Sequence, residues 1–371
     1  MLRTFEPAFK RSLSAGLRLL FAPSDIPPFD PGPSPRILVV RQHNQLGDML
    51  CVVPLLRALR RTYPSAYIAL MASPVNYEPM AGNRFVDEVI RFDKREFMGR
   101  EGGSLLRLRP YARDLRRRGF TVAIVPSTVS TSFTSDLMAY LSGAPVRIGA
   151  GSIEGAANPS AFFFTHPRAL DWRQTPERHQ ALRNMDIWPL ALGGESDLSA
   201  EISLDPDELR DGEAYLRSLS PGARRVIVYH PGAGKVPNRW PAERFAALAG
   251  SLSAAGATVI TAGPMDDAPV EIMTGGMRGP YGIMRNQPIR RVASALRFAD
   301  LVVSNDTGIM HVAGAVGTPV LSLFGPTDPR QWAPTGPQHR CIRGEGSDIT
   351  RIPLENVIDA AHEMLRRERE R

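Results

Sequence analysis

The sequence predicts an α/β protein made of two doubly wound halves, each with a parallel sheet between layers of helices. Short apolar runs such as RILVV, AYIALMAS and TVAIVPS alternate with longer amphipathic segments, and this alternation favours a parallel sheet covered on both faces. The alternation stops over about residues 151–220 and then resumes. A length of 371 residues agrees with two domains.

In the first half, strands are expected at RILVV, AYIALMAS, DEVIRFD, TVAIVPS and VRIGA. The segment MLCVVPLLRALRRTY is predicted to form one helix, with Pro54 as a kink near its first turns. A second helix is expected at SLLRLRPYARDLRRRG. The GAGS sequence at 149–152 resembles a glycine turn that follows a strand.

The second half begins with LDPDEL, where Asp205 is predicted to cap a helix and Pro206 to be its first residue. Strand RVIVYH, helix PAERFAALAGSLSAAG and strand ATVITAG follow. A helix–strand–loop–helix–strand series then runs from ALRFADLVVSNDTG to GTPVLSLFG, and LENVIDAAHEMLRRERER is expected to be the last helix. We therefore expect three parts, which are 1–35, 36–190 and 191–371.

Composition limits the classes of partner. The net charge is +7 and the pI is about 9.8, with most of the positive charge on arginine, whose fork suits phosphates and carboxylates. An anionic small molecule fits, whereas the sequence lacks the zinc-finger spacing and the aromatic-interleaved basic strands of nucleic-acid binders. Cys51 and Cys341 form no metal or disulfide pattern. No apolar run approaches the ~18 residues of a membrane span and no secretory signal is apparent, so a cytoplasmic location is expected.

The first 35 residues differ from the rest. Apolar side chains recur at helical spacing in residues 1–22, while basic side chains lie largely off that stripe. Such a helix can lie in a membrane interface, which suggests the cytoplasmic face of the inner membrane; packing on the protein's own surface is the alternative. Six prolines between Pro23 and Pro35 predict an extended, semi-rigid linker.

Asp48 is the candidate general base. It ends the loop after the first strand and is expected to open the next helix, at the edge where parallel sheets bind ligands. An ionised carboxylate there can accept a proton from a substrate hydroxyl, and Gly47 leaves room for a ligand. The alternative is an acid that only stabilises the helix N-terminus.

The loop HPGAGKVPNRWP follows a strand and contains a glycine turn. Gly232 and Gly234 let backbone N–H groups approach a phosphate, and Lys235 and Arg239 are placed to neutralise a diphosphate. The loop matches neither the P-loop nor the dinucleotide fingerprint. A GAG turn alone is a weak signal.

A third loop follows strand DLVVSN and opens a helix. The backbone N–H groups of Thr307 and Gly308, with the Thr307 hydroxyl, suit a diphosphate, and Asp306 can accept bonds from hydroxyls. His311 lies one turn into the helix and can reach the same site; a structural role is the alternative.

Two other features carry less information. Thr327 and Asp328, in the turn-rich loop FGPTDP, either border the same site or only pack. No metal site is apparent, because the only D-x-D, Asp205–Asp207, falls in the predicted helix cap.

Three stretches, 36–64, 230–248 and 299–332, together resemble glycosyltransferase family 9, the ADP-heptose:lipopolysaccharide heptosyltransferases. They occur in the family's order and spacing, and the likeness runs from residue 36 to about 365. The resemblance implies the GT-B fold, in which two Rossmann-like domains face a central cleft. It also implies inverting transfer from a nucleoside-diphosphate sugar, without metal or cofactor.

The resemblance also implies roles for parts of the chain. Residues 36–190 would take the acceptor, the lipopolysaccharide inner core, and residues 191–371 would bind ADP-heptose. Asp48 matches the aspartate of the family's GD motif, the proposed general base. One departure is Asn238, which stands where the family usually has a lysine. Lys235 is expected to supply the missing charge, with Arg239 as the alternative.

Two other functions remain open on the sequence. An enzyme on the same fold, such as a nucleotide-sugar epimerase, would act on the donor without an acceptor. A non-catalytic glycan- or nucleotide-binding protein would not need Asp48.

Overall fold

The computed structural model describes residues 26, 28–42, 44–98, 108–193 and 197–367, and the predicted helix at 1–22 lies outside them. Contacts divide the chain into two compact units. The first unit consists of Met1–Asn44, Val52–Tyr77 and Arg84–Asp197. The second consists of Gln45–Cys51, Glu78–Asn83 and Leu198–Arg371.

The first unit is built on one sheet, which runs in the order β3-β2-β1-β4-β5 and continues with β6 and β7, both paired to β5. All pairings are parallel except that of β5 with β6. The strands are β1 (Arg36–Arg41), β2 (Tyr67–Ala72), β3 (Glu88–Arg91), β4 (Val122–Ile124), β5 (Val146–Ile153), β6 (Ala156–Ala157) and β7 (His166–Leu170).

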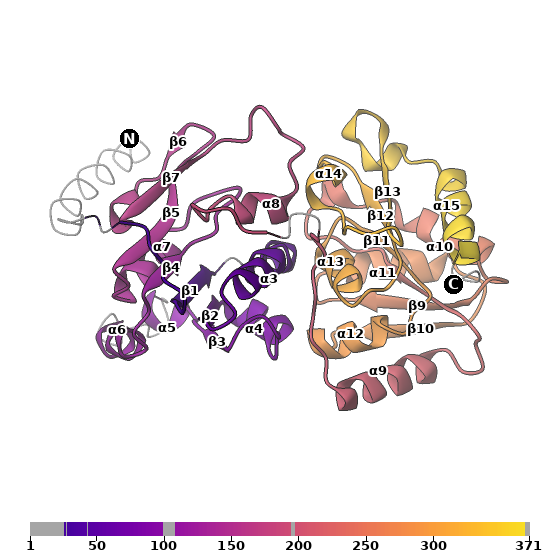
Figure 1. Ribbon diagram of the computed structural model, residues 1–371. Helices are drawn as coiled ribbons and strands as arrows, with labels where there is room; N and C mark the ends of the chain where they lie inside the picture. Colours follow the sequence, from indigo (N-terminus) through magenta and orange to yellow (C-terminus); the bar gives the residue numbers. More distant parts are fainter. Residues whose placement is uncertain (1–25, 27, 43, 99–107, 194–196, 368–371) are drawn as a thin grey trace. The chain divides into compact units, whose positions relative to one another are not determined.

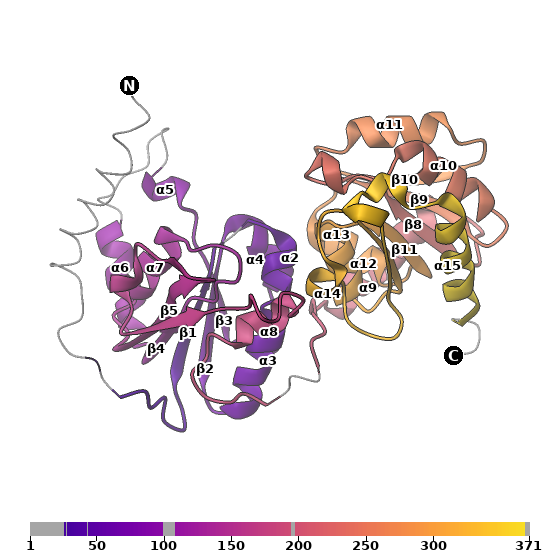
Figure 2. The same cartoon turned by 90° about the horizontal axis from the view of Figure 1, so that it is seen from above.

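Helices cover both faces of this sheet, with α6 and α7 on one side and α3 and α8 on the other (Figure 1; Figure 2). The core beneath α5, α6 and α7 is formed by alternate residues of β1 and β2, such as Leu38, Val40 and Met71, with Phe92 and Met138. The helices are α3 (Val53–Thr62), α4 (Pro74–Met80), α5 (Arg95–Met98), α6 (Leu108–Arg117), α7 (Phe133–Leu141), the 3₁₀ turn η2 (Ala161–Phe163) and α8 (Gln180–Met185).

The second unit repeats the same topology, in the order β10-β9-β8-β11-β12-β13, with every pairing parallel. This order confirms the prediction of two doubly wound sheets. The strands are β8 (Val226–His230), β9 (Ala257–Ala262), β10 (Tyr281–Arg285), β11 (Leu301–Asn305), β12 (Val320–Phe324) and β13 (Arg340–Arg343).

Helices α10, α11 and α15 share one core with this sheet, while α9 and α13 pack beside α12. The helices are α2 (Leu46–Leu50), α9 (Pro206–Leu219), α10 (Ala242–Ser251), α11 (Asp267–Gly275), α12 (Ile289–Leu296), α13 (Gly308–Ala315), α14 (Pro329–Trp332) and α15 (Leu354–Arg367). Three 3₁₀ turns complete the unit: η3 (Val236–Asn238), η4 (Glu345–Ser347) and η5 (Ile349–Arg351).

Two local predictions were wrong. The helix expected from Met49 to Tyr63 is two helices, α2 and α3, with Pro54 in the first turn of the second. The break falls just before Pro54, whose nitrogen cannot donate a backbone hydrogen bond to a preceding turn. The GAGS sequence is not a turn but part of β5, where Gly149 leaves room for the ring of Phe164. Helix α11 and strand β10 were not predicted.

The division of the chain also differs from the expected boundary after residue 190. Contacts place the boundary at Asp197/Leu198 and assign Gln45–Cys51 and Glu78–Asn83 to the second unit. The described part of the proline-rich linker packs on the first unit, where the ring of Phe29 meets Trp188 edge-on at 5.2 Å between centroids.

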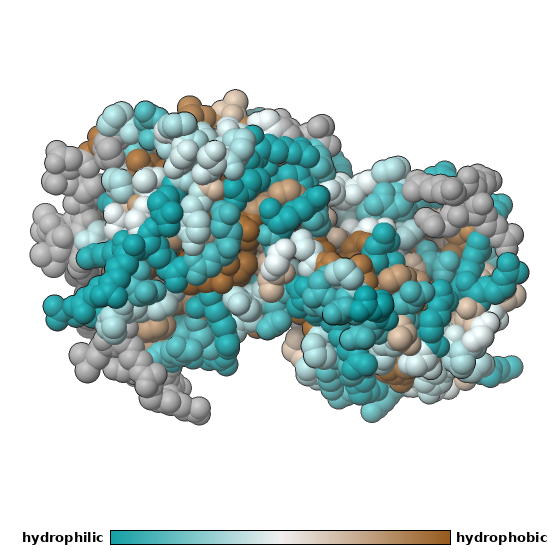
Figure 3. Space-filling view, turned by 60° about the horizontal axis from the view of Figure 1, so that its bottom comes forward, coloured by the Kyte–Doolittle hydropathy of each residue, from teal (hydrophilic) through white to brown (hydrophobic). Residues whose placement is uncertain are grey.

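Among the described residues, no helix is long and apolar enough to cross a membrane. Most of the surface on the face in Figure 3 is hydrophilic, and hydrophobic areas are interrupted by hydrophilic side chains.

Candidate active site

Two loops of the second unit meet where the strand order reverses. Strands β8 and β11 are neighbours, while the chain continues from β8 to β9 on one side and from β11 to β12 on the other. Ligands of such sheets bind outside the carboxyl ends of the strands at this point. The loops there are residues 231–240 after β8 and residues 306–307 after β11, which are two of the three stretches singled out in the sequence.

Asn305, the last residue of β11, fastens the two loops together. Its buried Nδ2 donates to the carbonyl oxygens of Pro231 at 2.9 Å and Gly232 at 3.1 Å. Its Oδ1 accepts from the backbone N–H of Trp240 at 3.0 Å. One amide therefore fixes both ends of the loop after β8. The sequence analysis missed Asn305, although its position at the end of a buried strand was a usable signal.

Gly232 is required by a buried carboxylate. A side chain at Gly232 would overlap Asp266, which follows β9 and accepts the N–H of Gly263 at 2.8 Å. Behind it, the Nδ1 of His230 lies 2.9 Å from the carbonyl oxygen of Thr261, and burial lowers the pKa of His230. The site therefore contains a second acid that the sequence analysis missed. Its signal was an acid after the second strand of a Rossmann-like half, the usual place of a ribose-binding residue.

Asp306 is half-buried among three polar groups. The Nδ2 of Asn238 donates to its Oδ2 at 3.1 Å. Burial raises the pKa of Asp306, while a hydrogen bond from Thr327 and the positive charge of Lys235 lower it. The structure thus brings together Asp306, Lys235 and Thr327 from loops far apart in the sequence.

The two candidate cations of the loop after β8 have different surroundings. Lys235 is exposed, and its charge acts on Asp306. Arg239 is half-buried, and its Nε donates to the carbonyl oxygen of Ala233 in the same loop at 2.8 Å. Arg239 therefore stabilises the conformation of the loop, whereas the side chain of Lys235 is exposed on it.

The N-terminus of α13 faces the same loops. Thr307 is its N-cap in an extended conformation, with no capping bond from its side chain, and Gly308 is its first helical residue. The first N–H groups of a helix have no partner within the helix and favour an anion through the helix dipole. This arrangement suits a phosphate, and phosphate binding here stays a prediction.

Helix α2 packs on this end of α13. A side chain at Gly47 would come within 2.6 Å of the His311 ring, and one at Gly308 within 3.2 Å of Leu46. The two glycines therefore allow the helices to approach closely. Asp48 lies in the first turn of α2 rather than in the loop before it, with 8% of its surface exposed.

His311 is buried by this packing, and its ring meets Trp332 edge-on at 6.3 Å between centroids. Asp328 has a structural role, because it caps α14 through the N–H of Arg330 at 2.9 Å. The D-x-D also lies in a helix cap, as predicted: Asp205 forms a capping box with Glu208.

The first unit has its own pocket at the corresponding edge. A cavity of about 140 Å³ lies at the carboxyl ends of β1, β2 and β3, and its lining includes Gln42, Ser73, Val75 and Lys94. In the described part of the chain, the buried Oγ of Ser73 and the Oε1 of Gln42 have no hydrogen-bond partner. The sequence analysis missed Gln42 and Ser73, although each directly follows a strand.

Lys94 is the available cation of this pocket. It is exposed, and its neighbours Asp93 and Arg95 bind each other at 2.8 Å. The pocket therefore offers a positive charge and unsatisfied polar atoms in the same place.

Comparison with known proteins identifies the family of the chain. The family model of glycosyltransferase family 9 (heptosyltransferase) matches residues 108–352. Lipopolysaccharide heptosyltransferase 2 of Salmonella typhimurium is 27% identical over 366 residues, which cover 90% of this chain and 99% of the relative.

Two solved structures share the fold. A glycosyl transferase family 9 protein from Veillonella parvula matches with a TM-score of 0.75 and 23% identity, over 89% of this chain and 97% of that chain. The ADP-heptose lps heptosyltransferase II of E. coli matches with a TM-score of 0.74 and 23% identity, over 90% and 99%. The fold is thus GT-B, and the chain belongs to glycosyltransferase family 9, the heptosyltransferase family.

Proposed function

We propose that this glycosyltransferase moves a heptose from ADP-heptose to the inner core of lipopolysaccharide, with inversion at the anomeric carbon. Its similarity to lipopolysaccharide heptosyltransferase 2 over nearly the whole length supports heptose as the transferred sugar and lipopolysaccharide as the acceptor. The E. coli protein of the same fold is named for ADP-heptose.

The observation that carries the proposal is the packing of α2 on α13. It joins the short helix that bears Asp48 to the helix whose N-terminus suits a diphosphate, through glycines at both contact points. A base and a leaving-group site are the two parts that a direct displacement needs.

In the proposed step, the Asp48 carboxylate removes the proton from an acceptor hydroxyl as its oxygen bonds to the anomeric carbon. The bond from that carbon to the β-phosphate oxygen breaks on the opposite side, and ADP leaves with the electron pair. Lys235 and the N–H groups at the start of α13 stabilise the new negative charge. Asp306 accepts hydrogen bonds from hydroxyls of the sugar.

Asp266 is proposed to bind the ribose of the donor. Its carboxylate is buried beside Gly232 at the end of the strand next to β8, where Rossmann-like folds place the acid that binds ribose hydroxyls. An Asp266→Asn variant should therefore lose most of the preference for ADP over 2′-deoxy-ADP in a calorimetric titration. An unchanged preference would exclude Asp266 from ribose binding.

On the acceptor side, Lys94 and the unsatisfied polar atoms of Ser73 and Gln42 suit an anionic group of the acceptor.

The direct test is mass spectrometry of the acceptor lipid after incubation with the protein and ADP-heptose. A gain of one heptose, with release of ADP, is expected. Incubation with donor alone serves as the control, because an epimerase would convert the donor without any acceptor. Conversion of donor alone, with no change in the lipid, would contradict the proposal.

Transfer is further proposed to need no metal, because the cation and the helix terminus do the work that a metal does elsewhere. Activity should survive EDTA. Loss of activity that Mg²⁺ or Mn²⁺ restores would overturn this part of the mechanism.

Contact of residues 1–22 with the inner membrane stays a prediction. Deletion of these residues should reduce binding to anionic vesicles and leave ADP binding unchanged. Equal vesicle binding by the truncated protein would make the segment a packing element.

A further inference from the structure

A cavity of about 420 Å³ in the first unit has no part in the sites described above. Its lining includes the last residues of β7 and the segment after this strand, and continues from the end of α8 to residue 192. Sites for small molecules usually enclose about 300–1,000 Å³. All lining residues belong to the first unit, so the cavity does not depend on where the second unit lies.

The two carboxylates of this lining are each bound by an arginine. Asp186 accepts from Nε of Arg178 at 2.7 Å and from Nη2 of the same side chain at 2.6 Å. The indole N–H of Trp172 donates to the same carboxylate at 2.8 Å. Asp171 accepts from Nε of Arg173 at 2.9 Å, and the hydrogen bonds from Arg173 lower the pKa of Asp171 to about 2. Both acids therefore already have a cation.

Arg168 is the cation of the lining that these acids leave unmatched. In the described part of the chain, its Nε is buried and has no hydrogen-bond partner. A buried donor that has lost water and gained no acceptor is unfavourable, and a guanidinium cannot lose its charge in a protein. The cavity therefore favours a ligand that brings a negative charge to Arg168.

The other polar groups of the lining narrow the class of ligand. The side chains of Asp171 and Asp186 remain 45% and 28% exposed, and the exposed Thr175 lines the same cavity. A carboxylate has about four acceptor positions, so each acid can still accept a hydrogen bond from a hydroxyl of the ligand. A bare anion would use only Arg168, and the two acids would repel it.

A fatty chain fits the lining poorly. The apolar side chains of Leu170, Met185, Trp188 and Leu192 are all buried, whereas Leu190 is 49% exposed. One exposed leucine can pack on the C–H face of a sugar ring, but it does not form the continuous apolar wall that an acyl chain requires. The lining as a whole suits hydroxyl groups beside one acid group.

We propose that this cavity binds a sugar that carries a carboxylate or a phosphate. The fork of Arg168 binds the acid group, because a guanidinium matches two oxygens of either anion. Asp171 and Asp186 accept hydrogen bonds from hydroxyls of the ring, and the ion pairs that hold these acids in place reduce the entropy lost on binding. Binding here uses the first unit alone and does not require that the protein transfer heptose.

The test is a titration followed by ligand-observed NMR, with glucuronate, glucose 6-phosphate, glucose and inorganic phosphate as the probes. Wild type should bind at least one acidic sugar about tenfold or more tightly than glucose, the scale of a charge-assisted hydrogen bond. The ranking of glucuronate and glucose 6-phosphate then shows whether the site prefers a carboxylate or a phosphate.

Arg168→Ala should weaken binding of the acidic sugar by about tenfold or more and leave binding of glucose unchanged, because glucose has no acid group. Arg109→Ala is the matched control, since Arg109 is an exposed cation of α6 that does not line the cavity. Two proteins and two sugars form a cycle that isolates the contact between Arg168 and the acid group. Arg168→Lys should bind with intermediate affinity, because it keeps the charge and loses the fork.

Three results would overturn the proposal. One is equal binding of the acidic sugars by wild type and Arg168→Ala. Another is inorganic phosphate bound as tightly as glucose 6-phosphate, which indicates an anion site without sugar recognition. The last is weaker binding in Lys94→Ala or Lys235→Ala instead of Arg168→Ala, which places the acid group in one of the sites described above.

Two measurements do not depend on the folding of Arg168→Ala. If that variant does not fold, equal affinity of wild type for glucose and both acidic sugars overturns the proposal, and so does wild-type affinity in Arg168→Lys. None of these titrations uses ADP-heptose or the acceptor lipid, so their failure is distinct from failure of the proposed function.

Discussion

The two sheets have the same strand order, but the polar side chains at their carboxyl edges differ in whether they have hydrogen-bond partners. In the second unit, polar side chains at this edge have partners: Asn305 binds backbone groups of the loop after β8, and Asn238 and Thr327 bind Asp306. In the first unit, the Oγ of Ser73 and the Oε1 of Gln42 are buried without partners among the described residues.

The edge of the second unit is therefore preorganised, whereas the edge of the first unit leaves polar atoms for a ligand to bind. A donor site that stabilises a leaving diphosphate gains from dipoles fixed in advance. A pocket with unsatisfied polar atoms gains most when a ligand supplies the missing bonds. The same topology can therefore serve two substrates, because the loops rather than the strands carry the chemistry.

The largest expected effect comes from Asp48, which lies in the first turn of α2. Asp48→Asn should lower kcat by ~10²–10⁴-fold, the usual range for a positioned base, without changing the affinity for ADP. The measurement is a steady-state assay with calorimetry of ADP as the control. Wild-type turnover in this variant would remove Asp48 from the mechanism.

The donor edge is tested by its two cations. Lys235→Ala should weaken ADP binding by roughly 1.5–3 kcal/mol, the scale of a charge-assisted hydrogen bond. Arg239→Ala should cost less, because Arg239 is bound to the carbonyl oxygen of Ala233. The reverse order in a calorimetric titration would assign the diphosphate to Arg239.

The buried carboxylate of Asp136 provides a test of how the stability of the first unit depends on pH. Burial raises the pKa of Asp136 to about 6, against hydrogen bonds from Ser160 and Asn158 that lower it. Because the folded state prefers the protonated form, this group stabilises the fold most below about pH 4, and that contribution is lost as the pH rises through 6.

Asp136→Asn should therefore remove a fall in stability between about pH 4 and 6 of order 1–3 kcal/mol. Denaturant unfolding at several pH values measures it, with wild type as the reference. The same slope in both proteins would show that another group titrates.

The smallest effect is expected at the acceptor pocket. Lys94→Ala should raise KM for the acceptor by about two- to fivefold, the scale of an exposed ion pair, and leave ADP binding unchanged. Arg91→Ala is the matched control, because Arg91 is an exposed cation at the end of β3 that does not line the cavity. Weaker ADP binding in Lys94→Ala would contradict the division between the two edges.

By itself, the sequence determined the two parallel sheets, the helix cap at Asp205 and the three loops at strand ends. Each follows from local patterns: apolar runs of strand length, a capping residue before a proline, and glycines after a strand. It also singled out Asp306 and Lys235, which lie in two of those loops.

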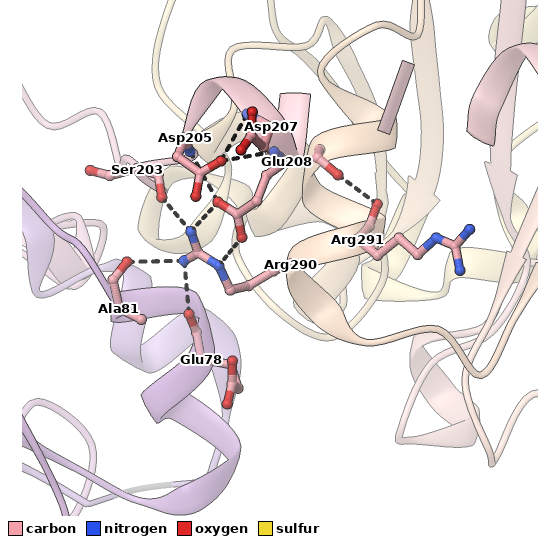
Figure 4. Close-up of polar contacts among 9 residues, drawn as sticks. Glu78, Ala81, Ser203, Asp205, Asp207, Glu208, Arg290 and Arg291 are labelled. Carbon is pink, nitrogen blue, oxygen red and sulfur yellow. Dashed lines mark hydrogen bonds and ion pairs between the residues drawn. The ribbon is translucent and has the colours of Figure 1, made fainter. Parts of the chain in front are cut away.

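Only the tertiary structure decided which loops meet. Asn305 ends a strand and Asp266 follows one, but their local sequence does not show which groups they bind, and Lys94 and Arg290 carry no such signal. Their roles depend on packing between segments far apart in the chain, as when Arg290 binds carbonyls 209 and 212 positions away (Figure 4). The sequence also did not show that Gln45–Cys51, which includes α2 and Asp48, belongs to the second unit by its contacts.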